Sequence, residues 1–352
     1  MGPIGFVSNG HTRQRYASKS DASGVRLHRM STPAESPLTR RLTPVAADLL
    51  RSIRASGFPG WSAMEVEQAR AAILEMKLFA GPQEPVGRVE QIHIAGRDGS
   101  DIRAQLYMPD SPGPVPTMVY MHGGGWVIGN YTSVDELVRT LVNRSGCAAL
   151  SVDYRLAPEH KFPAALNDIQ SAILWVIENA ATWRLDRNRL AVGGDSSGAN
   201  LAAAASLFRR DHGGPPLVFQ LLVYPALDCN YLTTSYQFFG DGALSAMSTA
   251  DVVWFHNQYV NRPDDLENPY VSPLRAESLA GLPRTLLICA EIDPLLDDSI
   301  EYARRLEQAG VPVEMQVYPG MFHGFWRMGG VLAEAREALN LAGETMRQAM
   351  TS

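Results

Sequence analysis

Two adjacent serines in the stretch GGDSSGAN, residues 193–200, carry hydroxyl groups of the kind that nucleophilic catalysis uses. Only Ser196 has a glycine two positions before it and two positions after it, at Gly194 and Gly198. This spacing is typical of a nucleophile elbow, a strand-to-helix turn so sharp that its neighbours must lack side chains. Glycine-rich turns with a serine also occur as strand-to-helix connections that have no catalytic role. Because the apolar run LAVGG precedes it and a helical pattern follows it, the sequence predicts Ser196 as a nucleophile.

A second glycine-rich stretch, HGGGW at 122–126, follows the apolar run TMVYMH. Consecutive glycines allow backbone N–H groups to turn toward a ligand oxygen at close range, although a flexible turn is the alternative for this stretch taken alone. An HGGG loop supplies the donors that a GxSxG serine needs. We therefore predict an oxyanion hole formed by the N–H groups of Gly124, Gly125 and Ser197, and a structural role for His122.

A general base and an acid should follow the nucleophile in the chain. Of the eight histidines, His323 follows the predicted strand VEMQVY at the sheet edge where open α/β sheets place their sites, whereas His256 lies in a helical pattern. The stretch TLLICAEIDPLLDD offers four carboxylates. Asp293 comes just past a strand and should orient the imidazole. Asp297 and Asp298 are expected to be N-cap and first-turn residues of the next helix.

Five motifs in this order resemble those of the hormone-sensitive-lipase-like carboxylesterases, bacterial family IV, of the α/β-hydrolase fold. They are HGGGW (122–126), DYRLAPEH (153–160), GDSSGAN (194–200), DPLLD (293–297) and HGF (323–325), and the resemblance covers residues from about 87 to 350. It implies a helical cap before the catalytic domain and a supporting role for DYRLAPEH. The family usually has GDSAG, so the serine at position 197 is a departure from its pattern.

The spacing of apolar residues along the chain predicts the helices and strands that position these residues. Helical patterns without a strand precede residue 85, and an antiparallel hairpin is predicted from about 87. Short apolar runs then alternate with amphipathic helices, which predicts an α/β fold with a mostly parallel central sheet and helices on both faces. We expect an N-terminal arm and helical cap over 1–85 and a catalytic domain over 86–352. Within it, 226–283 carries one clear helix and is expected to form a second cap or pocket wall.

Large aromatic residues in the two cap segments are expected to enclose the site. They are Trp61, Phe238, Phe239, Trp254 and Phe255. An enclosed pocket excludes long chains by volume, so we expect esters with acyl groups of up to about six carbons to be cleaved best.

The charge, cysteine content and hydrophobicity of the chain argue against several classes of function. A net charge of −6 and a pI near 5.8 give no reason to expect nucleic acid as a partner. The three cysteines have apolar neighbours, which predicts buried free thiols, and no cluster has metal-ligand spacing. No stretch resembles a secretion signal or a membrane span, so a soluble, cytoplasmic protein that needs neither metal nor cofactor is expected. The first thirty residues are expected to form a flexible or loosely docked arm, with a transit peptide as the alternative.

These observations predict a serine carboxylesterase that acts on small-molecule esters. Two alternatives stay open: an amidase or peptidase on the same fold, and a ligand-binding relative such as the plant gibberellin receptor, which lacks the catalytic histidine. Retention of His323 argues against a receptor. Family members are often dimers, so the resemblance also implies a possible homodimer.

Overall fold

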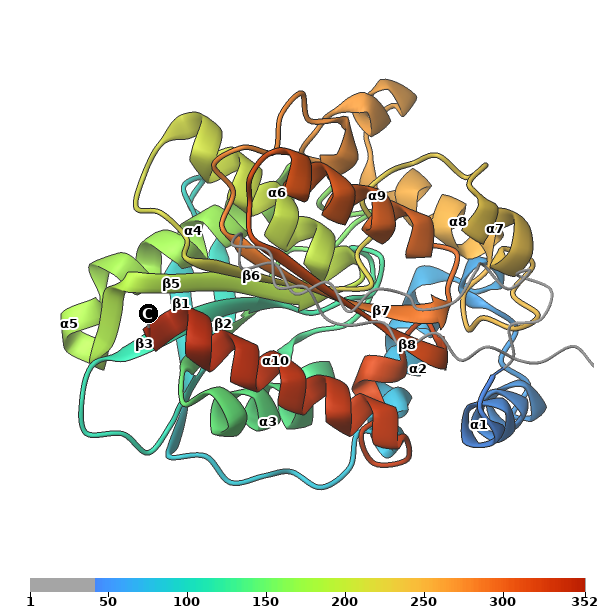
Figure 1. Cartoon of the computed structure of the whole chain (residues 1–352), viewed down its shortest axis with the longest axis horizontal. Helices are drawn as coiled ribbons and strands as arrows, with labels where there is room; N and C mark the ends of the chain where they lie inside the picture. Colours follow the sequence, from blue (N-terminus) through green and yellow to red (C-terminus); the bar gives the residue numbers. More distant parts are fainter. Residues whose placement is uncertain (1–41, 352) are drawn as a thin grey trace, which may run out of the picture.

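A single eight-stranded sheet forms the centre of the computed structural model, which describes residues 42–351 (Figure 1). The strand order is β1-β2-β4-β3-β5-β6-β7-β8. β1 and β2 form the predicted antiparallel hairpin, β2 pairs antiparallel with β4, and all other pairs are parallel. The strands are β1 (Arg88–Ala95), β2 (Asp101–Met108), β3 (Val115–Met121), β4 (Ala148–Asp153), β5 (Leu185–Asp195), β6 (Phe219–Val223), β7 (Arg284–Ile292) and β8 (Val313–Phe322). The prediction of a mostly parallel sheet is confirmed.

Helices cover both faces of this sheet, and the central strands are apolar for that reason. Every residue of β3 is buried, and its side chains alternate between two cores. One core lies under α4, α6 and α9, and the other under α3 and α10 (Figure 1). The α-helices are α1 (Pro44–Ala55), α2 (Val66–Glu75), α3 (Asp135–Ser145), α4 (Ala164–Glu178), α5 (Ala180–Trp183), α6 (Ser197–His212), α7 (Thr234–Phe239), α8 (Thr249–Tyr259), α9 (Leu296–Gln308) and α10 (Ala333–Thr351).

Two helical segments lie at the carboxyl end of the parallel strands and contribute to one pocket there. The first contains α1 and α2, with no strand between them, as predicted. The second, the excursion over 226–283, contains α7 as well as α8 and so has one α-helix more than predicted. On this arrangement we propose the division into a cap up to residue 85 and a catalytic domain after it. The arm predicted for the first thirty residues lies outside the described residues.

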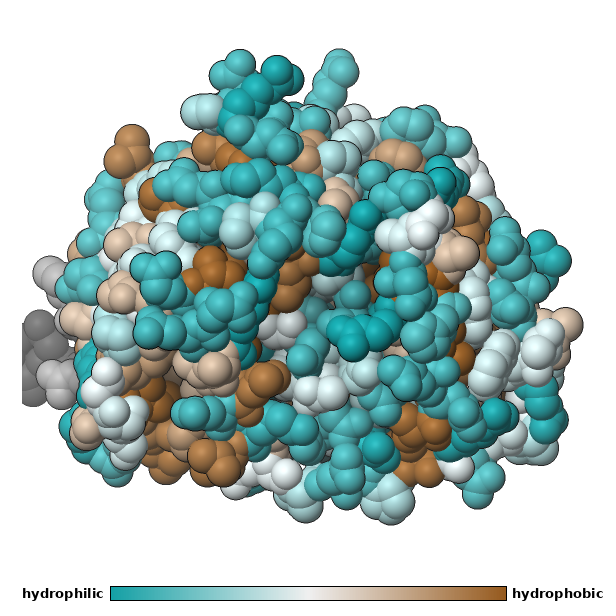
Figure 2. Space-filling model, turned by 180° about the vertical axis from the view of Figure 1, so that it is seen from behind, coloured by the Kyte–Doolittle hydropathy of each residue, from teal (hydrophilic) through white to brown (hydrophobic). Residues whose placement is uncertain are grey.

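The cysteine side chains are free thiols, as predicted, with Cys147 and Cys289 buried and Cys229 only partly so. Within residues 42–351, no group of three or more His, Cys, Asp or Glu side chains could hold a metal ion. The same part of the chain contains no helix with the length and hydrophobicity that crossing a bilayer requires. On the face seen in Figure 2, hydrophilic residues cover most of the surface and hydrophobic ones lie in small separate groups.

Candidate active site

The turn that carries Ser196 joins β5, which ends at Asp195, to α6, which begins at Ser197. Ser196 has a backbone φ of 57°, a value that side-chain-bearing residues adopt only under strain. A Cβ atom on Gly194 would come within 2.3 Å of the Met121 carbonyl oxygen, and one on Gly198 within 2.1 Å of the same atom. Both glycines are therefore required because the backbone of β3 passes directly beside the turn.

The structure brings Ser196, His323 and Asp293 together. Asp293 follows the last residue of β7, and His323 follows the last residue of β8. The Nε2 atom of His323 lies 3.0 Å from the Ser196 Oγ atom, and its Nδ1 atom lies 2.7 Å from Asp293 Oδ2. The second carboxylate oxygen of Asp293 accepts the Leu295 N–H at 2.9 Å, and the ring of Tyr224 packs 4.5 Å from the imidazole. Nucleophile, base and orienting carboxylate thus stand within hydrogen-bond reach of one another.

The carboxylates of Asp297 and Asp298 point to the cap and not to the imidazole. The prediction of an N-cap role is wrong, because Leu295 occupies the N-cap position of α9 and both aspartates lie in its first turn. Asp297 accepts the Ser235 N–H at 2.8 Å, and Asp298 accepts two backbone N–H groups at 227–228. These bonds fasten the excursion over 226–283 to the catalytic domain.

The glycine loop adopts backbone conformations that favour glycine. Gly124 and Gly125 have φ values of 128° and 58°, and a Cβ atom on Gly125 would come within 2.0 Å of the Phe255 ring. Both glycines line the same pocket as Ser196 and Ser197. Within residues 42–351, no hydrogen-bond acceptor is paired with the N–H groups of Gly124, Gly125 or Ser197. All three residues therefore stay candidates for the oxyanion hole that the sequence predicts.

One buried carboxylate, Asp195, connects the loops that carry these groups. Its Oδ1 atom accepts the Gly123 N–H at 3.1 Å and the Tyr120 hydroxyl at 2.9 Å, and its Oδ2 atom accepts Arg327 Nε at 2.8 Å. Gly123 belongs to the glycine loop, and Arg327 follows His323 by four residues. No local sequence pattern indicates this network, because Gly123, Asp195 and Arg327 lie in three separate segments of the chain.

The DYRLAPEH stretch supports the glycine loop from behind. The Tyr154 hydroxyl donates to the His122 carbonyl oxygen at 2.7 Å, and the two rings stack with centroids 4.4 Å apart. Glu159 pairs with Arg70 of α2, whose Nε atom donates to the Val127 carbonyl oxygen at 3.0 Å. This stretch therefore joins the cap to the glycine loop, which fits the supporting role that the family resemblance implies. His122 is buried and stacks on Tyr154, which fits the structural role predicted for it.

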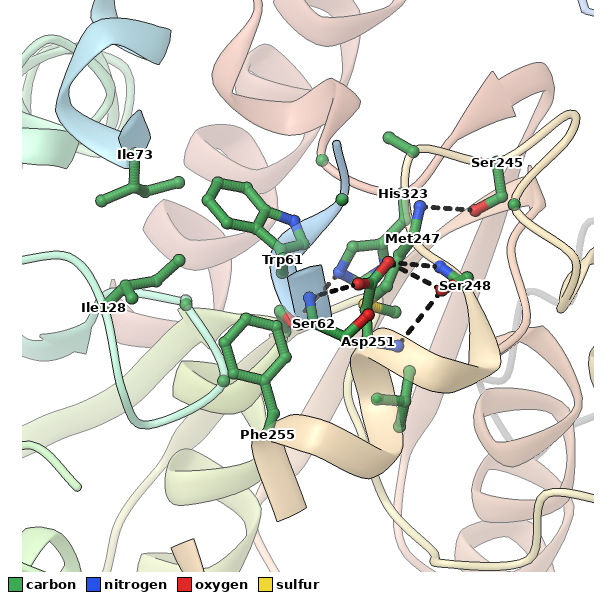
Figure 3. Close-up of a pocket in the computed structure, with 18 of the residues that line it drawn as sticks. Trp61, Ser62, Ile73, Ile128, Ser245, Met247, Ser248, Asp251, Phe255 and His323 are labelled. Atoms are coloured by element: carbon green, nitrogen blue, oxygen red, sulfur yellow. Dashed lines mark hydrogen bonds between the residues drawn. The ribbon is translucent and has the colours of Figure 1, made fainter. Parts of the chain in front are cut away.

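The pocket above Ser196 has a volume of about 340 Å³ and is lined mostly by apolar side chains. Figure 3 shows Trp61 and Phe255 side by side at its centre, with Ile73 and Ile128 beyond them. The centroids of the two aromatic rings are 6.4 Å apart. Phe238, Phe239 and Trp254 are not among the lining residues, so the expectation that they enclose the site is not met.

A family model described as alpha/beta hydrolase fold matches residues 118–327 of the chain. An ethyl acetate hydrolase from Pseudomonas putida is 35% identical over 318 residues, which cover 87% of this chain and 99% of that protein. The chain belongs to the hormone-sensitive-lipase-like carboxylesterases. The esterase is also 40% identical over 270 residues to a carboxylic ester hydrolase from Mycobacterium tuberculosis, covering 74% of this chain and 71% of that protein. A hyperthermophilic esterase from the archaeon Pyrobaculum calidifontis superposes with a TM-score of 0.84 at 37% identity, covering 89% of this chain and all of that one. The chain is accordingly a serine carboxylesterase.

His256 is a pocket residue of the esterase for which the sequence predicted no position in the site. It is buried, and its Nδ1 atom lies 3.0 Å from the Tyr231 hydroxyl. Burial lowers the pKa of its imidazole from the usual 6.5 to about 4. The same cause lowers the pKa of His122 to about 4. Both imidazoles are therefore neutral in the folded protein near neutral pH.

These two histidines make stability depend on pH. Between pH 6.5 and about 4, these histidines bind protons in the unfolded chain but not in the folded one. Their contribution to the free energy of unfolding is therefore complete above pH 6.5 and is lost as the pH falls toward 4. Each group changes the free energy of unfolding by at most about 1.4 kcal/mol per pH unit. We expect a lower urea midpoint at about pH 5 than at about pH 7.5, and a smaller difference in His256→Gln. Equal midpoints at the two pH values would contradict this assignment.

Proposed function

We propose that the esterase hydrolyses short-chain carboxylic esters through an acyl-enzyme intermediate on Ser196. As the Oγ atom attacks the ester carbonyl carbon, His323 Nε2 accepts its proton, and the carboxylate of Asp293 stabilises the imidazolium that forms. The observation that carries this proposal is the position of one imidazole between both partners, 3.0 Å from Oγ and 2.7 Å from Oδ2.

The attack places a negative charge on the former carbonyl oxygen. Gly124, Gly125 and Ser197 line the same pocket as Ser196, and preorganised backbone N–H donors contribute about 10²- to 10³-fold each to turnover. When the tetrahedral intermediate collapses, the C–O bond to the alcohol breaks and His323 returns the proton to the leaving oxygen. Water, activated by the same imidazole, then releases the acid from Ser196.

The size of the pocket supports the preference for short acyl groups. A volume of about 340 Å³ under Trp61 and Phe255 leaves limited room for an extended chain. We expect kcat/KM for dissolved p-nitrophenyl esters to be highest for acyl groups of up to about six carbons and to fall with each further pair of methylene groups. A series from acetate to palmitate measures this profile. Faster cleavage of long-chain triglyceride emulsions than of dissolved butyrate esters would overturn the proposed preference.

We also propose a cytoplasmic location and a homodimeric state. Three thiols without a disulfide partner suit a reducing compartment, which supports the location. The dimer rests on the resemblance to the family, whose members are often dimeric.

A further inference from the structure

A buried carboxylate at the pocket, Asp251, connects the two segments of the cap. It lies in the first turn of α8 and is 4% exposed. Its Oδ2 atom accepts the Ser248 N–H at 2.9 Å and the Ser248 hydroxyl at 2.8 Å, while its Oδ1 atom accepts the Ser62 N–H at 2.8 Å (Figure 3). All three donors are neutral.

The bonds to Ser248 are those of an ordinary helix start. Ser248 is the N-cap of α8, its hydroxyl oxygen accepts the Asp251 N–H at 3.1 Å, and the pair forms a capping box. That arrangement uses a single carboxylate oxygen. The other oxygen binds a residue 189 positions away in the chain, in the first cap segment. The bond to Ser62 is therefore not part of the helix start, and it connects the two cap segments.

The bond to Ser62 fixes the aromatic wall of the pocket. Ser62 directly follows Trp61 in a short 3₁₀ turn, η2 (Trp61–Ala63). The Trp61 ring lies against Phe255, which is one helical turn after Asp251 on the same face of α8. Phe255 in turn packs on Gly125 of the glycine loop. One face of α8 thus holds the turn at 61–63 in two ways. Asp251 binds its backbone at Ser62, and Phe255 packs against the Trp61 ring.

We propose that Asp251 is a positioning residue that sets the acyl-chain limit of the esterase. By holding the Ser62 N–H it keeps the Trp61 ring over the pocket, so the ring excludes the distal carbons of a long acyl chain. When the bond is lost, the turn at 61–63 can move outward and admit that chain, while the reacting groups on the catalytic domain stay in place. This inference rests on the proposed hydrolysis of short-chain esters at the same site.

The test is the ratio of kcat/KM for dissolved p-nitrophenyl decanoate to that for p-nitrophenyl butyrate. In Asp251→Ala we expect this ratio to rise about 10-fold, mainly through a lower KM for the decanoate. Arg54→Ala is the matched control. Arg54 also joins the two cap segments and lines the same pocket, but it is exposed, and it donates to the Gly242 and Ala243 carbonyl oxygens at 2.5 and 2.6 Å and not to the turn at 61–63. Its ratio should rise far less than that of Asp251→Ala.

An unchanged ratio in a folded Asp251→Ala variant, judged by circular dichroism, overturns the proposal. An equal rise in Arg54→Ala also overturns it, because the effect would then be a general loosening of the cap. If Asp251→Ala does not fold, Ser62→Pro decides, since removing the Ser62 N–H with the carboxylate in place must raise the ratio as well. A wild-type protein that does not hydrolyse the butyrate ester would instead contradict the proposed function.

Discussion

Replacing Ser196 with alanine is expected to lower kcat for ester hydrolysis at least about 10³-fold while leaving the fold intact. The substitution removes the Oγ atom that lies 3.0 Å from His323 Nε2, and no acyl-enzyme can then form. A methyl group fits where the hydroxymethyl group stood, because the tight contacts of this turn involve its glycines. Steady-state rates with p-nitrophenyl butyrate and thermal unfolding of both proteins measure the two expected effects.

The matched control is Ser197→Ala. This variant loses a hydroxyl but keeps the backbone N–H on which the proposed oxyanion hole depends, so we expect a change of less than about 10-fold. Comparable losses in the two alanine variants, with both folded, would mean that the hydroxyls have been assigned to the wrong roles.

Replacing Asp293 with asparagine is expected to lower kcat about 10³- to 10⁴-fold. The carboxylate accepts a hydrogen bond from His323 Nδ1 at 2.7 Å, which holds the ring in the tautomer that leaves Nε2 free to accept the serine proton. A neutral amide can also present its NH₂ group to the ring and select the other tautomer, and it stabilises the imidazolium poorly. Since the change is isosteric, KM should change far less than kcat.

Asp297→Asn is the control for this prediction. Asp297 bonds the backbone of Ser235 and does not contact the imidazole, so its loss should appear in the free energy of unfolding, by about 1 kcal/mol, and little in kcat. Values of kcat that rank the two variants the other way would show that the acid has been misplaced.

The reacting residues were predictable because each has a local signature. Gly194 and Gly198 mark Ser196, and the end of an apolar strand precedes both Asp293 and His323. The sheet followed from the alternation of short apolar runs with amphipathic helices. The short helix α7 was missed because six residues carry too little periodicity to be told from a loop.

Contacts between distant segments account for what the sequence did not reveal. Asp297 and Asp298 have the composition of a helix start, yet the excursion over 226–283 supplies their partners. Asp251 is recognisable from its neighbour Ser248 as part of a capping box, but its bond to Ser62 depends on how two cap segments meet. Local pattern predicts what a residue can do, whereas the partner it finds is a property of the folded chain.

The network around Asp195 has a consequence for how this enzyme can change over evolutionary time. One carboxylate fastens the turn of the nucleophile, the glycine loop through Gly123 and the histidine loop through Arg327. A mutation that shifts any one of these loops strains the other two, so selection for new substrates has few tolerated paths within the catalytic domain. The cap touches the glycine loop at Phe255 and Arg70, but the side chains that bond Asp195 belong to the catalytic domain, so the cap can vary under less constraint. New specificities are therefore expected to arise first from substitutions in residues 42–85 and 226–283, and laboratory libraries confined to those segments should contain a larger share of active variants than libraries of equal size around Asp195.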